Sequence, residues 1–390
     1  MTLSRRHFFL GSLALPVWAA KKRQEERPNL LFIVADELPS WALGVSGNQE
    51  IHTPGIDQLA RTGTRFFNHF AAAPVAGLNR GTLMTGRTPM QLGDTENPPG
   101  SDGSLEKIVS TLGYTASTAD SRNAAQFLER PPAGKPFLLT VGCPSLRAPY
   151  EGVPQKYLDL YAKTRFDSLN ALRIPAANAQ RGKEMFGDLI GNLRKAAAAV
   201  TAFDDDVAMM VAKLTQKGLL DNTLVILTST CGALLGRHGL WDAGQASNPV
   251  NMFDEAIATP MIWSWPGRIP TQGARPEMVG AYDFVPTVCD LFDMEIPGGP
   301  SCGRSYLLVA TGKPLPKKQP WRTTVFSHFG NTDMARTERY KLVTRTQGPN
   351  EFYDLTADPG EKVNQYENPQ FMSARGPLAD RLTQWKAKYS

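Results

Sequence analysis

The chain has 390 residues, of which 42% are hydrophobic and 20% are charged. It therefore holds enough apolar side chains for a large buried core, and its composition excludes a globally disordered protein. Its formal net charge of +5 is too small and too dispersed along the chain to indicate a nucleic-acid-binding protein.

The first twenty residues carry a targeting pattern. Arg5 and Arg6 lie in a segment that resembles the twin-arginine export motif, residues 8–18 form an apolar stretch, and residues 17–19 are a small-x-small cleavage pattern. We predict a twin-arginine signal peptide over residues 1–20 and a periplasmic or extracellular protein. The apolar stretch is shorter than the about 20 residues of a membrane-spanning helix, so no stable span is expected. The alternatives are an uncleaved anchor and the basic first helix of a cytosolic protein.

Alternating apolar and amphipathic segments predict an α/β domain. Residues 30–35 are apolar at every position, as in a parallel strand that is buried on both faces. Thr53 and Pro54 supply a cap and a first-turn residue for a helix. Further expected elements are a helix between Ser104 and Gly113, strands 114–119 and 137–141, a long helix that ends at Gly218, and strands 223–228 and 260–263. This alternation is typical of a doubly wound α/β sheet.

The pattern changes near Trp321. Short alternating strands, such as residues 340–344, and a terminal helix from about Pro377 follow it. They predict a small C-terminal α+β subdomain over residues 321–390.

Four cysteines are present, and none has the spacing of zinc ligands. Cys289 and Cys302 are the nearer pair in sequence, and an exported protein can form disulfides. The alternative is that the cysteines are small buried core residues.

Residues 73–87 read Ala-Pro-Val-Ala-Gly-Leu-Asn-Arg-Gly-Thr-Leu-Met-Thr-Gly-Arg. This segment resembles the active-site segment of the type I sulfatases of the alkaline phosphatase superfamily, where Cys-x-Pro-Ser-Arg is followed by Leu-Leu-Thr-Gly-Arg. Six further segments resemble that family in the same order, namely residues 27–37, 53–60, 221–229, 236–241, 334–341 and 352–361. The resemblance implies an alkaline-phosphatase-like mixed sheet with helices on both faces over residues 27–320, followed by the small subdomain.

In that family the cysteine is oxidised to formylglycine, whose hydrate attacks sulfur. Ala76 occupies the matching position, and a methyl group has no lone pair with which to attack. Leu78 and Asn79 replace the proline and serine of the motif, so no formylglycine is expected. Arg80 remains, and we expect its guanidinium either to bind an anion or to anchor the start of the helix.

The family also holds a calcium ion with ligands from two pairs at the ends of strands, an Asp-Asp pair after the first strand and an Asp-His or Asp-Asn pair after the late one. Asp36 and Glu37 match the first pair, and they are the candidate metal ligands here. Thr230 and Cys231 match the second pair but supply no charge, and a sulfur is a poor ligand for a hard cation. Calcium is therefore doubtful, and the alternative for Asp36 and Glu37 is to stabilise the turn after the strand.

The remaining family positions have also changed. The resemblance places Ser121 and Asn123, Arg147, and Ala243 where the family has lysine and histidine side chains that hold the sulfate and protonate the leaving group. Arg147 and His238 are the residual polar candidates, although a single histidine often has only a structural role.

The site as a whole predicts an exported sulfatase-family protein that has lost sulfuric ester hydrolysis. Such a protein would bind a sulfated or anionic glycan, or a small ligand, or stabilise a partner. The alternatives are a residual or redirected hydrolase of sulfate or phosphate esters, with water held by Arg80, Glu37 and Arg147, and a purely structural envelope protein.

Overall fold

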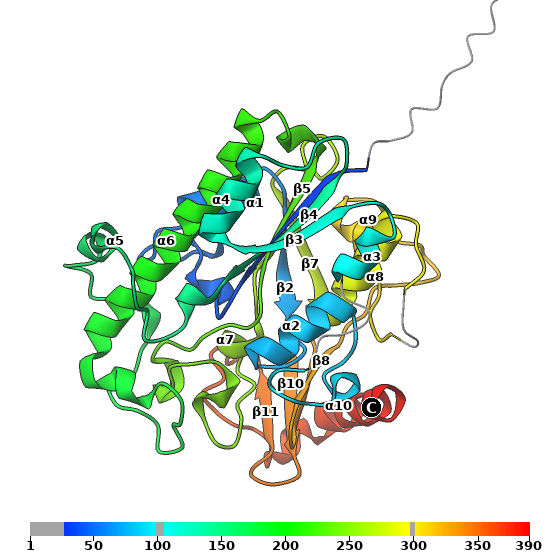
Figure 1. Ribbon diagram of the computed structural model, residues 1–390. Coiled ribbons are helices and arrows are strands. Elements are labelled where there is room, and N and C mark those ends of the chain that lie inside the picture. The colour runs from blue at the N-terminus through cyan, green and yellow to red at the C-terminus, as the bar shows by residue number, and fades with distance from the viewer. Residues whose placement is uncertain (1–26, 99–104, 297–300) are drawn as a thin grey trace, which may run out of the picture.

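The computed structural model describes residues 27–98, 105–296 and 301–390. The predicted signal peptide at residues 1–20 and the predicted helix start at Ser104 lie outside these residues. The larger part of the molecule is a seven-stranded sheet covered by helices, and a four-stranded sheet lies beside it (Figure 1).

The large sheet has the order β3-β4-β1-β5-β6-β2-β7, and only β6 runs antiparallel to its neighbours. Its strands are β1 (Asn29–Ala35), β2 (Thr64–Phe70), β3 (Thr115–Asp120), β4 (Phe137–Cys143), β5 (Thr223–Ser229), β6 (Met261–Ser264) and β7 (Gly273–Gly280). This arrangement confirms the predicted mixed sheet.

The central strands end together. All seven residues of β1 and of β5 are buried, as expected for strands covered on both faces. Ala35, at the end of β1, pairs with Cys143 of β4 and with Ser229 of β5. The residues that follow these strands are therefore brought to the same edge of the sheet.

Helices cover both faces of the sheet (Figure 1). Leu31 and Ile33 of β1 pack with α1 (Pro54–Arg61), α4 (Ser121–Glu129) and α6 (Leu189–Gln216), and α5 (Gln155–Leu160) packs on α6. Phe32 and Val34 pack on the other face, where α2 (Ala76–Thr85), α3 (Leu105–Ser110), α8 (Phe284–Leu291) and α9 (Leu307–Ala310) lie. Successive side chains of β1 point to opposite faces of the sheet, so this one strand contributes to the hydrophobic core on each face.

The C-terminal part is an antiparallel sheet with one long helix against it. Its strands are β8 (Val325–Phe329), β9 (Thr332–Arg336), β10 (Tyr340–Arg345) and β11 (Glu351–Asp354). Leu378, Leu382 and Trp385 of α10 (Met372–Tyr389) form the core between helix and sheet. The helix begins five residues before the predicted start at Pro377, because Phe371 and Ala374 also pack on this core and extend the apolar face toward the N-terminus.

Two strands were not predicted, β2 and β7. β2 contains Arg65, Asn68 and His69, and β7 is an edge strand that contains Pro276 and Glu277. Neither has the apolar run or the strict alternation that marks a strand, so their pairing with each other is fixed by tertiary contacts.

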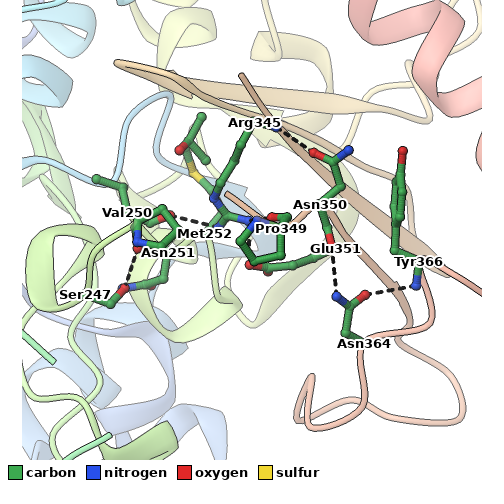
Figure 2. A network of polar contacts seen from close by, with 12 residues as sticks. Ser247, Val250, Asn251, Met252, Arg345, Pro349, Asn350, Glu351, Asn364 and Tyr366 are labelled. Atoms are coloured by element: carbon green, nitrogen blue, oxygen red, sulfur yellow. Dashed lines mark hydrogen bonds and ion pairs between the residues drawn. The ribbon is translucent and has the colours of Figure 1, made fainter. Parts of the chain in front are cut away.

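A polar network joins the C-terminal sheet to the loop that precedes α7 (Asp254–Ile257), as Figure 2 shows. Arg345 of β10 is buried and donates hydrogen bonds to the carbonyl oxygens of Val250 (2.9 Å) and Pro349 (2.6 Å). Asn251 donates from Nδ2 to Ser247 Oγ and to the carbonyl oxygen of Ala243. The C-terminal sheet is thereby linked to one of the positions that the family resemblance assigns to the site.

All four cysteines are free thiols, and Cys143, Cys231 and Cys289 are buried. The structure thus agrees with the core alternative and has no bridge between Cys289 and Cys302. In the part of the chain that the structure describes, no helix is both long and apolar enough to cross a membrane.

Candidate functional site

Residues 73–87, the segment that resembles the sulfatase active site, contain α2. The position that matches the family's cysteine lies at the start of this helix. Asn79 fixes the helix: its Nδ2 donates to the carbonyl oxygen of Thr230 (2.6 Å) and its Oδ1 accepts from the backbone N–H of Ala72 (2.8 Å). The side chain is fully buried. The helix start is therefore tied to the end of β5 by the residue that replaces the serine of the motif.

Ala76 is the first residue of α2 and is 7% exposed. Its methyl group packs with Cys231 and Ala243 in a small apolar cluster. Burial raises the pKa of the Cys231 thiol well above its usual value, and the nearby carboxylates of Glu37, Asp242 and Asp36 raise it further. The thiol that packs against Ala76 is therefore protonated and is a poor nucleophile.

Asp36 and Glu37 follow β1 directly and meet two arginines. Asp36 Oδ1 accepts from Arg80 (3.1 Å) and from Thr230 Oγ1 (3.2 Å). Arg147, which follows β4 after a short turn, has its terminal nitrogen 3.5 Å from Asp36 Oδ2 and its Nε 3.3 Å from Glu37 Oε1. Four of the residues singled out from the sequence are thus brought together: Asp36, Glu37, Arg80 and Arg147.

Glu37 also contacts Asp242, a residue that sequence reasoning missed. Burial raises the pKa of Glu37 well above its usual value, and the charge of Asp242 and a hydrogen bond to it raise the pKa further, against the lowering effect of Arg147. A hydrogen bond between two carboxyl groups requires a proton on one of them. The position of Asp242, directly after the recognisable segment 236–241, was the available signal.

Arg147 is charged in this setting. Burial alone would lower its pKa, but Asp36 and Glu37 outweigh burial and leave the pKa above its usual value.

A small cavity of about 80 Å³ opens beside Ala76. Its lining includes Glu37, Arg147 and Asp242, together with Glu96 and Arg181, whose side chains are 44% and 53% exposed and form the outer wall. Glu96 accepts from Arg181 (3.0 Å) and from Gln245 Nε2 (2.5 Å). These outer residues come from loops and were not identified in the sequence, because no motif marks them.

His238 lies apart from this cavity. Its Nε2 is 3.4 Å from Glu255 Oε2, and its ring stacks on Phe253 with centroids 3.8 Å apart. It lines a separate cleft of about 920 Å³ together with Arg237 and Lys362. The histidine is held by packing and by its contact with Glu255, and the structure does not bring it to Ala76.

Ser121 and Asn123 begin α4 instead of lining the cavity. Asp120 caps this helix by accepting from the backbone N–H of Asn123 (2.8 Å). These positions therefore serve a helix terminus.

The donor set does not fit calcium. Ca²⁺ prefers six to eight oxygen ligands, several of them anionic. Within the described ranges, no group of three or more His, Cys, Asp or Glu side chains is arranged to hold a metal ion. Asp36 and Glu37 instead have guanidinium partners, so no step of a reaction is assigned to a metal here.

Comparison with known proteins identifies the family. A sulfatase family model matches residues 28–121 and 113–294, and the C-terminal model of N-sulphoglucosamine sulphohydrolase matches residues 236–388. An ulvan-active sulfatase of Formosa agariphila is 23% identical over 93% of this chain and 82% of its own length. An N-acetylglucosamine-6-O-sulfatase of Bacteroides thetaiotaomicron is 22% identical over 97% of this chain and 90% of its own.

Solved structures show the same fold. One is a protein solved in complex with its substrate, D-glucosamine-2-N,6-O-disulfate. Its TM-score against this chain is 0.79 at 19% sequence identity, and the match covers 93% of this chain and 98% of the solved chain. Another is the phosphonate monoester hydrolase of Agrobacterium radiobacter, with a TM-score of 0.79, 18% identity, and coverage of 93% and 96%. The sulfatase family model matches well over half of the length of this chain. The chain therefore belongs to the sulfatase family.

Proposed function

We propose that this sulfatase-family protein is exported, does not hydrolyse sulfuric esters, and binds the sulfate group of a glycan in the cavity beside Ala76. The observation that carries the loss of catalysis is the side chain at the nucleophile position. Ala76 has no atom that can attack sulfur, and its neighbour Cys231 is a buried, protonated thiol.

The size of the effect supports a complete loss. Removal of a catalytic nucleophile alone can cost about 10⁶ in kcat, and the remaining binding groups then supply about 10³ to 10⁴ over water. Here Ala243 stands at the family's lysine position, and Thr230 and Cys231 stand at its second pair of metal ligands. Apart from Arg80, the groups that would supply the residual rate are therefore missing as well.

The proposed ligand follows from the cavity and from the relatives. The cavity is small compared with the about 300–1,000 Å³ of pockets for drug-sized ligands, so it would accept one substituent and leave the sugar ring outside. Arg147 and Arg181 line it beside the acidic Glu37, Glu96 and Asp242, and a guanidinium has five N–H groups, so each arginine retains donors that suit a tetrahedral anion. The named relatives include an ulvan-active sulfatase and a structure with a disulfated glucosamine.

Export is part of the proposal and rests on the sequence alone. The twin-arginine pattern at Arg5 and Arg6 would place the protein in the periplasm or outside the cell. Comparison of culture fractions with an Arg5→Lys/Arg6→Lys variant tests it, since that variant should stay inside the cell.

Calorimetric titration tests the binding. Sulfated and desulfated forms of one glucosamine oligosaccharide are titrated into the protein. The mass of the recovered oligosaccharide is then measured by mass spectrometry, to show whether it has lost sulfate. We expect the sulfated form to bind and to be recovered intact, and Arg181→Gln to weaken binding about 10-fold or more through loss of a charge-assisted hydrogen bond. Equal binding of the desulfated form would contradict the proposal.

A matched control is available at Arg165. This arginine is exposed and pairs with the equally exposed Asp167 at 3.6 Å, away from the cavity. Arg165→Gln should leave the affinity unchanged. Equal weakening by the two variants would indicate a nonspecific charge effect.

A redirected ester hydrolase is the second candidate, and one observation favours it. Glu37 has a raised pKa and contacts Asp242 in a cavity, which is the setting of many general acids. Turnover of aryl sulfates and aryl phosphates, assayed with and without divalent cations, distinguishes the two candidates. Activity that Glu37→Gln removes and Arg165→Gln leaves intact would support the hydrolase.

A further inference from the structure

The carboxylates after β1 are held by two arginines, one from helix α2 and one from the turn after β4. Arg80 of α2 binds one oxygen of Asp36, at 3.1 Å. Arg147 lies across both carboxylates, with one nitrogen near the other oxygen of Asp36 and its Nε near Glu37. The two guanidinium groups therefore contact the same acidic pair that the family resemblance assigns to calcium.

Burial makes these partners necessary. The side chains of Asp36 and Glu37 are only 11% and 12% exposed. A carboxylate in such a place is costly unless a positive charge or several hydrogen-bond donors compensate it. Thr230 Oγ1 adds one neutral donor to Asp36, so the arginines supply the charge.

The two arginines supply the same positive charge as a divalent ion would, beside three carboxyl groups of which Glu37 and Asp242 are hydrogen-bonded to each other. Two guanidinium groups carry together the +2 charge of one calcium ion, and each directs N–H donors at carboxylate oxygens. The family's second pair of metal ligands is replaced by Thr230 and Cys231, which leaves one fewer carboxylate to neutralise. A metal ion and the Arg147 guanidinium would also compete for the same oxygens of Asp36 and Glu37.

We propose that Arg147, assisted by Arg80, is a built-in cation that takes the place of calcium in this protein. The site is then assembled without metal, and removal of the Arg147 charge exposes a weak calcium site at Asp36 and Glu37. This inference concerns the same cavity as the proposed function but does not depend on a glycan or on the absence of hydrolysis, since it is tested with calcium alone.

Thermal unfolding of the whole protein in EGTA and in calcium chloride tests the inference. The wild-type protein should unfold at the same temperature in both. Arg147→Met, which keeps the aliphatic volume, should unfold at a lower temperature in EGTA, because Glu37 and one oxygen of Asp36 lose their cation. Calcium at about ten times its Kd should then raise that temperature by about 1–2 °C.

Two further variants separate charge from structure. Arg147→Lys keeps a positive charge and should show no calcium effect, whereas Arg165→Met removes an exposed arginine elsewhere and should behave as the wild type does. A calcium-dependent rise in the wild-type protein would overturn the inference. So would an Arg147→Met variant that folds and shows no calcium response by unfolding or by calorimetric titration.

Discussion

Asp36 is the residue that holds the remaining charges of the site together. It accepts from Arg80 and Thr230 on one oxygen and lies beside Arg147 on the other, and it is largely buried. Its backbone N–H also donates to the carbonyl oxygen of Cys143, so the residue is fixed between β1 and β4. This geometry assigns Asp36 a structural part that does not require catalysis.

Replacement of Asp36 should therefore destabilise the protein. Asp36→Ala leaves two arginines without their shared partner and should lower the free energy of unfolding by about 1.5–3 kcal/mol, the usual contribution of hydrogen bonds to charged groups. Asp36→Asn keeps an acceptor oxygen and should cost less. Urea unfolding followed by circular dichroism measures both, and an Asp36→Ala variant as stable as the wild type would contradict this role.

Restoring the family's cysteine at Ala76 should not restore the modification. Leu78 and Asn79 remain in place of the proline and serine by which the modifying enzyme recognises its target. Ala76→Cys, co-produced with a formylglycine-generating enzyme, should keep an unmodified thiol in intact-mass and peptide mass spectra. Detection of an aldehyde at residue 76 would show that the altered motif is still recognised.

At the scale of elements, the start of α2 is fitted closely to the loop that carries Glu96. A Cβ built on Gly77 would collide with the carbonyl oxygen of Glu96. Glu96 is itself held by Arg181 and Gln245 in the outer wall of the cavity. Gly77 thus sets the distance between the helix and this wall.

Two glycine substitutions test this fit. Alanine is the better helix former by about 0.8–1 kcal/mol, yet Gly77→Ala should destabilise the protein by about 1–3 kcal/mol because backbone must move. Gly187→Ala, at an exposed position of the 3-10 helix Lys183–Asp188, is the matched control: its Cβ meets no atom within 4 Å, and it should stabilise the protein slightly. Denaturant midpoints of the two variants should move in opposite directions. A stabilising Gly77→Ala would show that the loop carrying Glu96 can move away from the helix without cost.

The elements also show how far sequence reasoning reaches. β1, β5 and α6 were predictable because burial on both faces, or on one helical face, leaves a continuous or periodic apolar pattern. β2 and β7 were missed because their polar residues carry no such pattern. Within the site, Asp36 lies directly after β1 and Arg147 lies one short turn after β4, so both could be found. Glu96 and Arg181 meet only through the packing of loops.

At the scale of the whole molecule, buried charges join the C-terminal sheet to the rest. Ser327 Oγ of β8 donates to the carbonyl oxygen of Ala71, which follows β2. Lys341 of β10 is fully buried between Asp254 (2.5 Å) and Glu361 (2.6 Å). We propose that residues 321–390 form a subdomain that depends on these contacts and does not fold alone.

His328 of β8 makes this junction sensitive to pH. Burial alone would lower its pKa, but Asp333 (2.7 Å) and Asp94 (3.3 Å) raise it from 6.5 to about 9. A pKa raised on folding stabilises the protein fully below the unfolded value, and this contribution is lost as the pH rises through about 9. The loss should be up to about 3 kcal/mol.

Unfolding temperatures measured between pH 6 and pH 10 test this dependence. Burial also raises the pKa of Glu361 from 4.5 to about 8. The contribution of this carboxyl to stability is therefore fully present below pH 4.5 and is lost as the pH rises through about 8. His328→Gln should therefore lower the stability at pH 6 and flatten the pH profile, while the part due to Glu361 remains. An unchanged profile would contradict the contribution of His328.

Loss of sulfuric ester hydrolysis is tested most directly by the free sulfate released from glucosamine 6-sulfate during a long incubation, with and without calcium. We predict a release equal to that of buffer in both conditions, because Ala76 offers no nucleophile and Cys231 is a buried thiol. Release well above buffer that Arg80→Ala abolishes would contradict it.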